Sequence, residues 1–290
     1  MDISLGKKIY SKNITEIDEV LKSSKVKFVI LNKIRSGITA NTYLAKYKKD
    51  KSIIKVFKKQ NQKNKLITNQ FLINSIQDQM VVKKLFPEVT YYDKKEGVLI
   101  YKYFEENNLK LRRNKLIELI GISLSNLHSI KPNKNIKTFE DQLSAYNKIL
   151  ISNKKNKYVE EINYLFKKIE SYEKGEKIFS HNDLNATNIL CSGKDMCFID
   201  FEYSGMNSRF CDISRIVESF NLKGQEIKIL IRSYGIKNDS TVIDNINDWR
   251  LMNSYLDLIW AYVINKIHKG SIKDDFISNL ELKLDNKGNK

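Results

Sequence analysis

The 290-residue chain has few cysteines, only two prolines and no long apolar run. Its cysteines, Cys191, Cys197 and Cys211, are odd in number and lack the paired C-x2-C spacing of a zinc site, so we expect free thiols in a reducing compartment. No stretch reaches the roughly 18 consecutive apolar residues typical of a membrane-spanning helix. Residues 1–8 lack the apolar segment of a secretory signal. The sequence therefore predicts a soluble, cytoplasmic protein without a membrane span.

Acidic residues are also scarce: 34 Asp and Glu stand against 51 Lys and Arg, which gives a net charge of +17. Such a charge can attract nucleic acid, anionic lipid or an acidic substrate. Residues 46–65 contain nine lysines and a single acid, Asp50. The remaining lysines are nevertheless scattered along the whole chain, whereas a nucleic-acid-binding protein usually concentrates its basic residues in one stripe. We therefore expect a surface that tolerates many lysines, and no specific nucleic-acid partner.

Residues 178–203 carry the most informative pattern in the chain. His181, Asp183 and Asn188 stand at the spacing of a kinase catalytic loop, H-x-D-L-x-x-x-N. Two short apolar runs, 188–191 and 196–199, predict a hairpin that leads directly to Asp200. Ordinary turns could explain any one of the Asn and Asp residues, but not the histidine, the spacing and the aspartate after a strand together. We predict that Asp183 orients an attacking hydroxyl and that Asn188 and Asp200 hold Mg²⁺.

The rest of the chain divides into a β-rich first part and a helical second part. The β-like runs cover residues 28–34, 42–47, 52–57, 89–92 and 98–103. Helical spacing of apolar residues marks residues 66–85, 115–130, 139–150, 158–172, 213–220, 224–234, 248–269 and 271–284. We expect an α+β protein with two lobes: an N-terminal nucleotide-binding lobe (1–104), formed by a five-stranded antiparallel sheet with a helix, and a larger, mostly helical C-terminal lobe (105–290).

A nucleotide site is expected on the N-terminal lobe. Lys55 shares a strand face with Ile53 and Phe57, and we assign it to the ATP phosphates, although an exposed lysine would also fit the pattern. The loop after the first strand holds a single glycine, so a plain β-turn remains an alternative to a phosphate-binding loop. The ATP contacts expected from this loop and from the last strand are Ser36, Gly37, Thr39, Asn41, Tyr101 and Tyr103.

Two runs carry a resemblance to a known family: S-H-N-D-L-x-x-x-N-I-L, and I-D-F-E-Y-S-x-x-N-x-R-x-x-D-I. Over residues 34–267 the chain resembles the choline and ethanolamine kinases, especially the bacterial ones, within the wider group of aminoglycoside phosphotransferases. The resemblance implies a two-lobed protein-kinase-like fold and ATP- and Mg²⁺-dependent phosphorylation of a small cationic alcohol, choline first and ethanolamine second. It also implies that Asp183 is catalytic and that His181 and Asp212 brace its loop.

The resemblance further implies an acceptor site built from an acidic residue and aromatic rings, at Glu218 and Trp260. A quaternary ammonium cannot donate a hydrogen bond, so aromatic faces and a carboxylate suit it. Further candidates for this site are Glu202, Tyr203, Trp249, Tyr255 and Tyr262. Leu72 replaces the family's helix glutamate, and Val263 replaces its second late tryptophan. Two alternatives therefore stay open: another small-molecule kinase, such as an aminoglycoside or thiamine phosphotransferase, and a non-catalytic nucleotide-binding protein.

Overall fold

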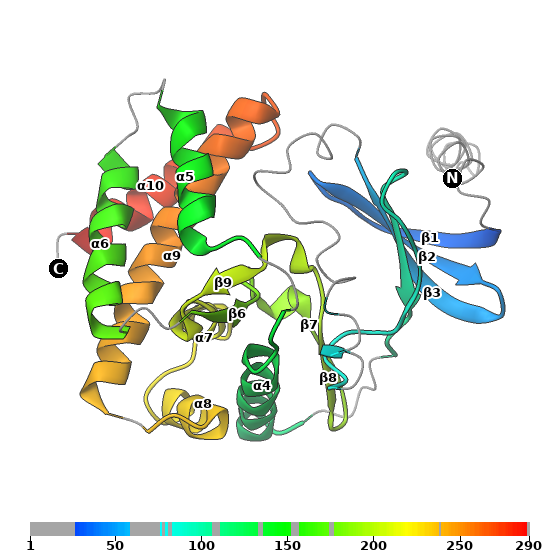
Figure 1. The fold of residues 1–290 in the computed structure, drawn as a ribbon, viewed down its shortest axis with the longest axis horizontal. Helices are drawn as coiled ribbons and strands as arrows, with labels where there is room; N and C mark the ends of the chain where they lie inside the picture. Colours follow the sequence, from blue (N-terminus) through cyan, green and yellow to red (C-terminus); the bar gives the residue numbers. More distant parts are fainter. Residues whose placement is uncertain are drawn as a thin grey trace, which may run out of the picture. The chain divides into compact units, whose positions relative to one another are not determined.

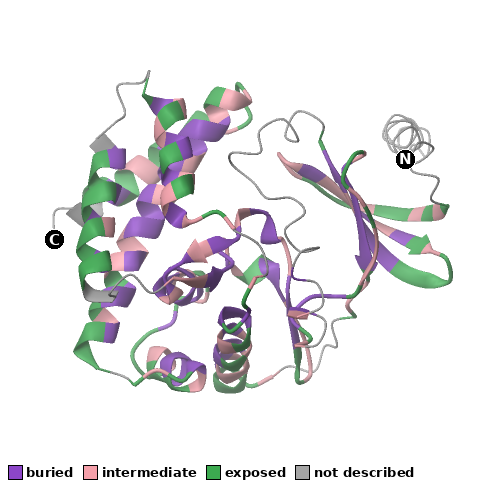
Figure 2. Ribbon diagram, viewed as in Figure 1, coloured by how far each residue is buried: buried purple, intermediate pink, exposed green. Residues whose placement is uncertain are grey.

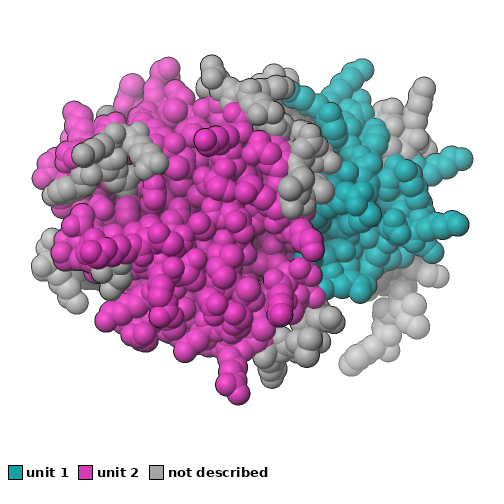
Figure 3. All heavy atoms as spheres, turned by 60° about the horizontal axis from the view of Figure 1, so that its bottom comes forward, with its two compact units in different colours: residues 1–65, 87–105 teal, residues 66–86, 106–290 magenta. Residues whose placement is uncertain are grey.

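The chain forms two compact units, residues 1–65 with 87–105 and residues 66–86 with 106–290 (Figure 3). This computed structural model describes residues 27–58, 76, 79–80, 83–105, 111–132, 136–151, 157–173, 177–237 and 239–288. Most of the helix predicted over 66–85, including Leu72, lies outside the described residues.

The first unit contains a five-stranded sheet in the order β1-β2-β3-β5-β4, with every neighbouring pair antiparallel (Figure 1). Its strands are β1 (Phe28–Ser36), β2 (Ala40–Tyr47), β3 (Asp50–Phe57), β4 (Val89–Asp93) and β5 (Val98–Lys102). Tyr43, Ile54 and Ile100 lie opposite one another on β2, β3 and β5 and belong to one buried cluster. Alternation of apolar residues along each strand produces this cluster, and the predicted antiparallel sheet is confirmed.

The second unit is mostly helical. Its described helices are α4 (Arg113–His128), α5 (Phe139–Leu150), α6 (Lys157–Glu173), α7 (Arg209–Ser219), α8 (Gln225–Tyr234), α9 (Ser240–Ile267) and α10 (Asp274–Gly288). Two small strand pairs accompany them: β6 (Ile178–Ser180) with β9 (Gly205–Asn207), and β7 (Ile189–Ser192) with β8 (Asp195–Phe198). The second of these pairs is the predicted hairpin.

Helix α9 is the central packing element of this unit and contacts α5, α6, α7 and α10. Figure 2 shows the buried residues that run along its length. The helix begins at Ser240, eight residues before the predicted start. Its first turn is capped by the Asp239 carboxylate, which accepts a hydrogen bond from Val242 N at 2.9 Å. The apolar pattern alone could not place this start, because the first two turns are largely polar.

Helices α4 and α8 lie side by side and run in the same direction. Near their starts Arg113 pairs with Glu226, and at their ends the His128 Nδ1 atom lies 2.8 Å from the Tyr234 hydroxyl. Midway along α4, an added Cβ on Gly121 would lie 2.8 Å from the Leu230 carbonyl oxygen. Glycine is needed at this position because the backbones approach too closely for a side chain.

The three cysteines are free thiols, as predicted. Burial raises the pKa of Cys197 to about 12. The thiol therefore stays protonated and packs as a small apolar group in the core. None of the helices in the described part of the chain combines the length and apolar character needed to cross a lipid bilayer.

Candidate active site

The loop after β6 is held in an unusual backbone conformation by neighbouring polar groups. Asn182 has a φ of 67°, in the left-handed region that asparagine tolerates better than most residues. Its side-chain amide donates to the Tyr203 carbonyl oxygen at 3.1 Å, and its side-chain oxygen accepts from Asn207 at 2.9 Å. The direction in which the chain enters Asp183 is therefore set by contacts on both sides of this asparagine.

Asp212, in the first turn of α7, anchors the same loop. Its carboxylate is fully buried and accepts hydrogen bonds from the backbone N–H groups of His181 at 2.7 Å and Asn182 at 2.8 Å. Burial by itself raises the pKa of this carboxyl, but the hydrogen bonds and charges of His128, 3.0 Å away, and of His181 together outweigh it and leave the pKa below its ordinary value. Asp212 thus has the bracing role that the resemblance implied, while His128 is a packed helix-end residue.

His181 joins the loop to the strand before Asp200. Its Nε2 atom lies 2.9 Å from the Ile199 carbonyl oxygen, and its Nδ1 atom accepts from the Asp183 backbone N–H at 3.3 Å. Because Nδ1 is the acceptor, Nε2 carries the proton that binds the carbonyl. The histidine therefore holds the segments of Asp183 and Asp200 together and is not itself poised for proton transfer.

Asp183, Asn188 and Asp200 come together at one place. The Asn188 amide nitrogen donates to the Asp183 carbonyl oxygen at 2.8 Å and to its carboxylate at 3.3 Å. Burial raises the pKa of Asp183, Arg215 and His181 oppose this shift, and the charges of Asp200 and Asp257 add to it. The structure thus brings together the three residues predicted from their spacing.

The donor set of this cluster fits Mg²⁺. The Asn188 nitrogen donates to Asp183, so its amide oxygen is the atom that can coordinate a cation, and the carboxylate of Asp200 is the second candidate ligand. Among the described residues, no group of three or more His, Cys, Asp or Glu side chains could hold a metal by itself. Mg²⁺ commonly takes one or two protein oxygens and completes its shell with phosphate and water, so these residues suit a metal that arrives with a nucleotide.

Trp260 is connected to the catalytic loop through Tyr203. The indole N–H donates to the Tyr203 hydroxyl at 2.8 Å, and the Tyr203 carbonyl oxygen accepts from Asn182, the residue before Asp183. Burial raises the pKa of Tyr203, with further contributions that include the charges of Glu202 and Asp183. Glu202 itself is buried. Tyr203 and Trp260 therefore form an aromatic pair that is linked to the loop of Asp183.

The other predicted aromatic residues lie elsewhere. Tyr255 and Tyr262 face α6, where their rings lie 5.9 and 6.5 Å from that of Tyr158, and Tyr262 also bonds Glu281 of α10. At 100° per residue these two tyrosines occupy the face of α9 opposite Trp260. Trp249 is fully buried and packs edge-on against Phe139, with ring centroids 5.7 Å apart. The structure does not bring these three rings to Asp183.

Glu218, the acidic residue expected for the acceptor, already has a cationic partner. The Arg250 Nε atom of α9 donates to its carboxylate at 2.5 Å. Another pair, absent from the sequence expectations, lies between the same helices: Arg215 Nη1 donates to Asp257 Oδ1 at 2.6 Å. The spacing offered a signal, because Arg215 precedes Glu218 by three residues and Asp257 precedes Trp260 by three.

Tyr146 of α5 is a third residue that the sequence did not single out. Its ring is buried and its hydroxyl accepts from the Gln142 amide at 2.8 Å. Burial raises the pKa of this tyrosine, and the charges of Asp183, Arg215 and Asp257 also act on it. These residues from α5, α7 and α9 are therefore electrostatically coupled to the Asp183 carboxylate.

The residues expected to bind the nucleotide lie in the first unit. Gly37 N donates to Ala40 O at 2.8 Å, and the Ser36 hydroxyl donates to the Asn41 side-chain oxygen at 2.8 Å, so the β1–β2 loop is a tight turn. Lys55 pairs with Thr42 across β2 and β3, and its ammonium lies 5.2 Å from the Phe57 ring centre. The Thr39 carbonyl oxygen accepts from Lys58 N at 2.9 Å, while Tyr101 is buried and Tyr103 N donates to Lys51 O at 3.0 Å.

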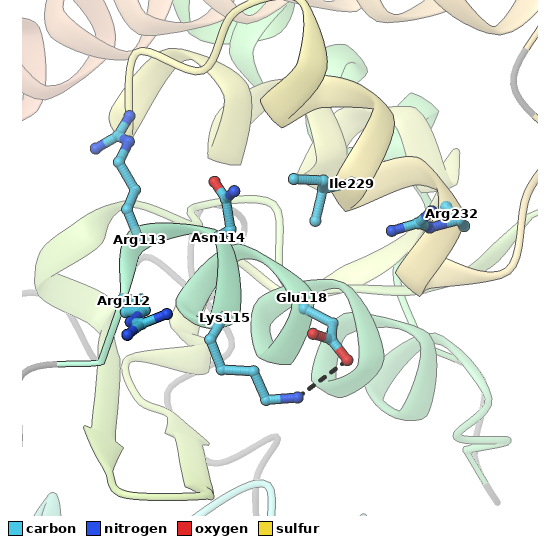
Figure 4. Close-up of a pocket in the computed structure, with 7 residues that line it drawn as sticks. All are labelled: Arg112, Arg113, Asn114, Lys115, Glu118, Ile229 and Arg232. Atoms are coloured by element: carbon cyan, nitrogen blue, oxygen red, sulfur yellow. Dashed lines mark hydrogen bonds and ion pairs between the residues drawn. The ribbon is translucent and has the colours of Figure 1, made fainter.

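A basic surface pocket with a volume of about 600 Å³ lies at the start of α4. Figure 4 shows the residues that line it. It is lined by Arg112, Arg113, Asn114, Lys115, Glu118, Ile229 and Arg232. None of these belongs to the catalytic cluster, and His128, which touches the anchor Asp212, stands at the other end of α4. The pocket is therefore separate from the candidate active site.

Comparisons with known proteins agree with this geometry. A family model described as Choline/ethanolamine kinase matches residues 31–218. Protein LicA of Haemophilus influenzae is 28% identical over 159 residues, which is 51% of this chain and 59% of LicA, so the match spans little more than half of that relative. The choline kinase LicA of Streptococcus pneumoniae superposes with a TM-score of 0.69 at 19% identity, covering 94% of this chain and 97% of the other.

A more distant structure, an ADP-bound aminoglycoside phosphotransferase, superposes with a TM-score of 0.60 at 15% identity, covering 92% of this chain and 95% of the other. At such low identity both structural likenesses concern the fold, and they confirm the expected two-lobed α+β kinase-like architecture. Since the family model matches well over half of the 290 residues, the chain belongs to the choline/ethanolamine kinase family.

Proposed function

We propose that this protein phosphorylates the hydroxyl group of a small cationic alcohol in the cytoplasm, with ATP as donor and Mg²⁺ as metal. Choline is the first candidate acceptor and ethanolamine the second. The observation that carries the proposal is the meeting of Asp183, Asn188 and Asp200 in one loop assembly, where Asn188 is buried and the two aspartates are half-buried. Three oxygen-bearing side chains in this arrangement suit phosphoryl transfer, in which positioning and charge stabilisation supply most of the catalysis.

Asp183 is the residue that acts on the acceptor. Its carboxylate accepts a hydrogen bond from the acceptor hydroxyl, orients the oxygen for in-line attack on the γ-phosphorus, and receives the proton as the new oxygen–phosphorus bond forms and ADP leaves. Bound Mg²⁺ offsets the negative charge on the phosphates, and Asn188 and Asp200 are the residues that would hold it. The hydrogen bonds of Asp212 and His181 keep these groups in place.

We assign the nucleotide to the N-terminal lobe, 1–104, and the acceptor to the catalytic lobe, 105–290. Lys55 would bind the phosphates and the backbone near Tyr101 and Tyr103 the adenine. The β1–β2 loop would cover the phosphates through Ser36, Gly37, Thr39 and Asn41. On the acceptor side, Trp260 and Tyr203 offer ring faces to a quaternary ammonium, which aromatic quadrupoles attract.

The test is a coupled assay of ADP release with Mg²⁺-ATP and separate acceptors: choline, ethanolamine, an aminoglycoside and thiamine. We expect turnover of choline and ethanolamine above the ATP-only rate. Turnover of the aminoglycoside alone would replace the acceptor assignment, and the solved aminoglycoside phosphotransferase of similar fold makes it the proper comparison.

The variant Asp183→Asn separates an enzyme from a nucleotide-binding protein. It keeps the size of the side chain but cannot accept the proton, so turnover should fall by about three orders of magnitude or more while ATP affinity stays within a fewfold of wild type. Unchanged turnover in this variant would contradict the assignment of Asp183.

A further inference from the structure

Helices α7 and α9 are joined by two ion pairs with opposite polarity. Arg215 of α7 binds Asp257 of α9 at 2.6 Å, whereas Glu218 of α7 accepts from Arg250 of α9 at 2.5 Å. The partners are three residues apart on α7 and seven apart on α9, so both sets lie on the facing surfaces of the two helices. Each helix therefore offers one base and one acid to the other.

The Arg215–Asp257 pair is electrostatically coupled to residues of the candidate site. The charges of both residues act on Asp183, and they act on Tyr146 as well. Asp257 lies one turn before Trp260, whose indole bonds Tyr203 beside the catalytic loop. Asp257 therefore lies on the same side of α9 as Trp260, one of the rings proposed for the acceptor.

The two members of this pair differ in access. The Arg215 side chain is 18% exposed, whereas that of Asp257 is 42% exposed. Arg215 reaches Asp257 Oδ1, and the other oxygen, Oδ2, accepts no hydrogen bond from the described residues. The Oδ2 atom of Asp257 is therefore available to a ligand, while the guanidinium of Arg215 is less exposed than the carboxylate.

We propose that Asp257, rather than Glu218, binds the cationic group of the acceptor. Arg215 weakens this binding because it neutralises part of the charge of the Asp257 carboxylate. The inference rests on the proposed function and names the residue that recognises the substrate. An ammonium group near Trp260 gains from the Asp257 charge and is repelled by Arg215. The pair thus sets how strongly a cationic alcohol is preferred to a neutral one of the same shape.

The signs of the expected effects differ for the two partners. Asp257→Asn should raise KM for choline about tenfold or more with kcat within a fewfold of wild type. Arg215→Met should lower KM for choline severalfold, because it frees the carboxylate. The neutral analogue 3,3-dimethyl-1-butanol should show little change in either variant, since it has no charge for Asp257 to bind.

The matched controls are Glu218→Gln and Arg250→Met, which remove the other ion pair between the same helices. We expect KM for choline to stay within about twofold in both. If Glu218→Gln raises KM and Asp257→Asn does not, the inference is overturned. A rise in KM for choline and the neutral analogue alike in both Asp257→Asn and Arg215→Met would indicate a structural role and also overturn it.

Calorimetric titration of choline keeps the inference separate from the proposed function. Absence of turnover by the wild-type protein contradicts the function, whereas equal choline affinity in wild type and Asp257→Asn contradicts the inference. Thermal unfolding identifies folded variants, and Arg215→Gln replaces Arg215→Met if the latter does not fold, with the same expected direction.

Discussion

At the scale of single residues, the site contains two carboxylates in different states: Asp212 is fully buried and Asp183 is half-buried. Asp212 has all of its contacts within the protein, and its hydrogen bonds outweigh the effect of burial on its pKa. For Asp183, the charges of Arg215 and His181 do not offset the effect of burial, so its pKa is raised. The first carboxylate supports the loop, and the second is the one that we propose acts on the acceptor hydroxyl.

We predict that Asp212→Asn destabilises the protein by about 2–4 kcal/mol, because an amide cannot accept from His181 N, Asn182 N and His128 without placing a donor against a donor. The folded-state pKa of Asp212 is lowered, so its stabilisation is present above the ordinary carboxyl pKa of 3.8 and is lost as the pH falls through the folded-state value. Urea unfolding at neutral and acidic pH measures both effects.

The control for this variant is Glu118→Gln. Glu118 lies on the exposed surface of α4, where it pairs with Lys115. Exposed pairs of this kind contribute little, so its stability should change by less than about 0.5 kcal/mol. An equally small change for Asp212→Asn would contradict its anchoring role.

At the scale of elements, helices α4 and α8 pack side by side in parallel, and their C-terminal ends reach the base of the loop that carries Asp183. His128 and Tyr234 stand at the ends of the two helices, and His128 contacts Asp212. Gly121 determines how closely the helices approach. The loop position therefore depends on helix packing some distance from it.

We predict that Gly121→Ala destabilises the protein by about 1–3 kcal/mol despite the better helix propensity of alanine, because the new Cβ would overlap the Leu230 carbonyl oxygen at 2.8 Å. Thermal or urea unfolding measures the change. Asn126→Ala, on an exposed position of the same helix, should be neutral or slightly stabilising. A stabilising effect of Gly121→Ala would show that the two backbones can move apart at little cost.

At the scale of the whole molecule, the net charge of +17 is spread along the chain, and the two acidic residues between α7 and α9, Glu218 and Asp257, each pair with an arginine. The basic surface would repel the cationic alcohol proposed above at long range, so the proposed recognition depends on the nearby carboxylate and rings assigned to the acceptor. The surface charge would thus oppose the approach of the proposed substrate.

We predict that binding to double-stranded DNA is weak, independent of sequence and steeply salt-dependent, because phosphate contacts alone would support it. Fluorescence anisotropy at about 50 and 200 mM salt measures the slope, with a neutral polymer as control. Tight binding to one sequence that survives at the higher salt would contradict this prediction.

Local patterns predicted most of the fold. The five strands followed from apolar alternation, and the helices from spacing of three and four, with ends that mostly differ by a few residues. The short β6–β9 pair was missed, since three-residue strands carry too little alternation to be recognised. The early start of α9 was missed because Asp239 stabilises it through a cap.

The sequence by itself determined the antiparallel sheet and the loop that unites Asp183, Asn188 and Asp200, because these depend on spacings of a few residues. Only the tertiary structure decided which carboxylates are neutralised beside that loop. Arg215 with Asp257 and Glu218 with Arg250 are 42 and 32 residues apart in the chain. Their pairing depends on how α7 lies against α9, and no local pattern encodes that contact.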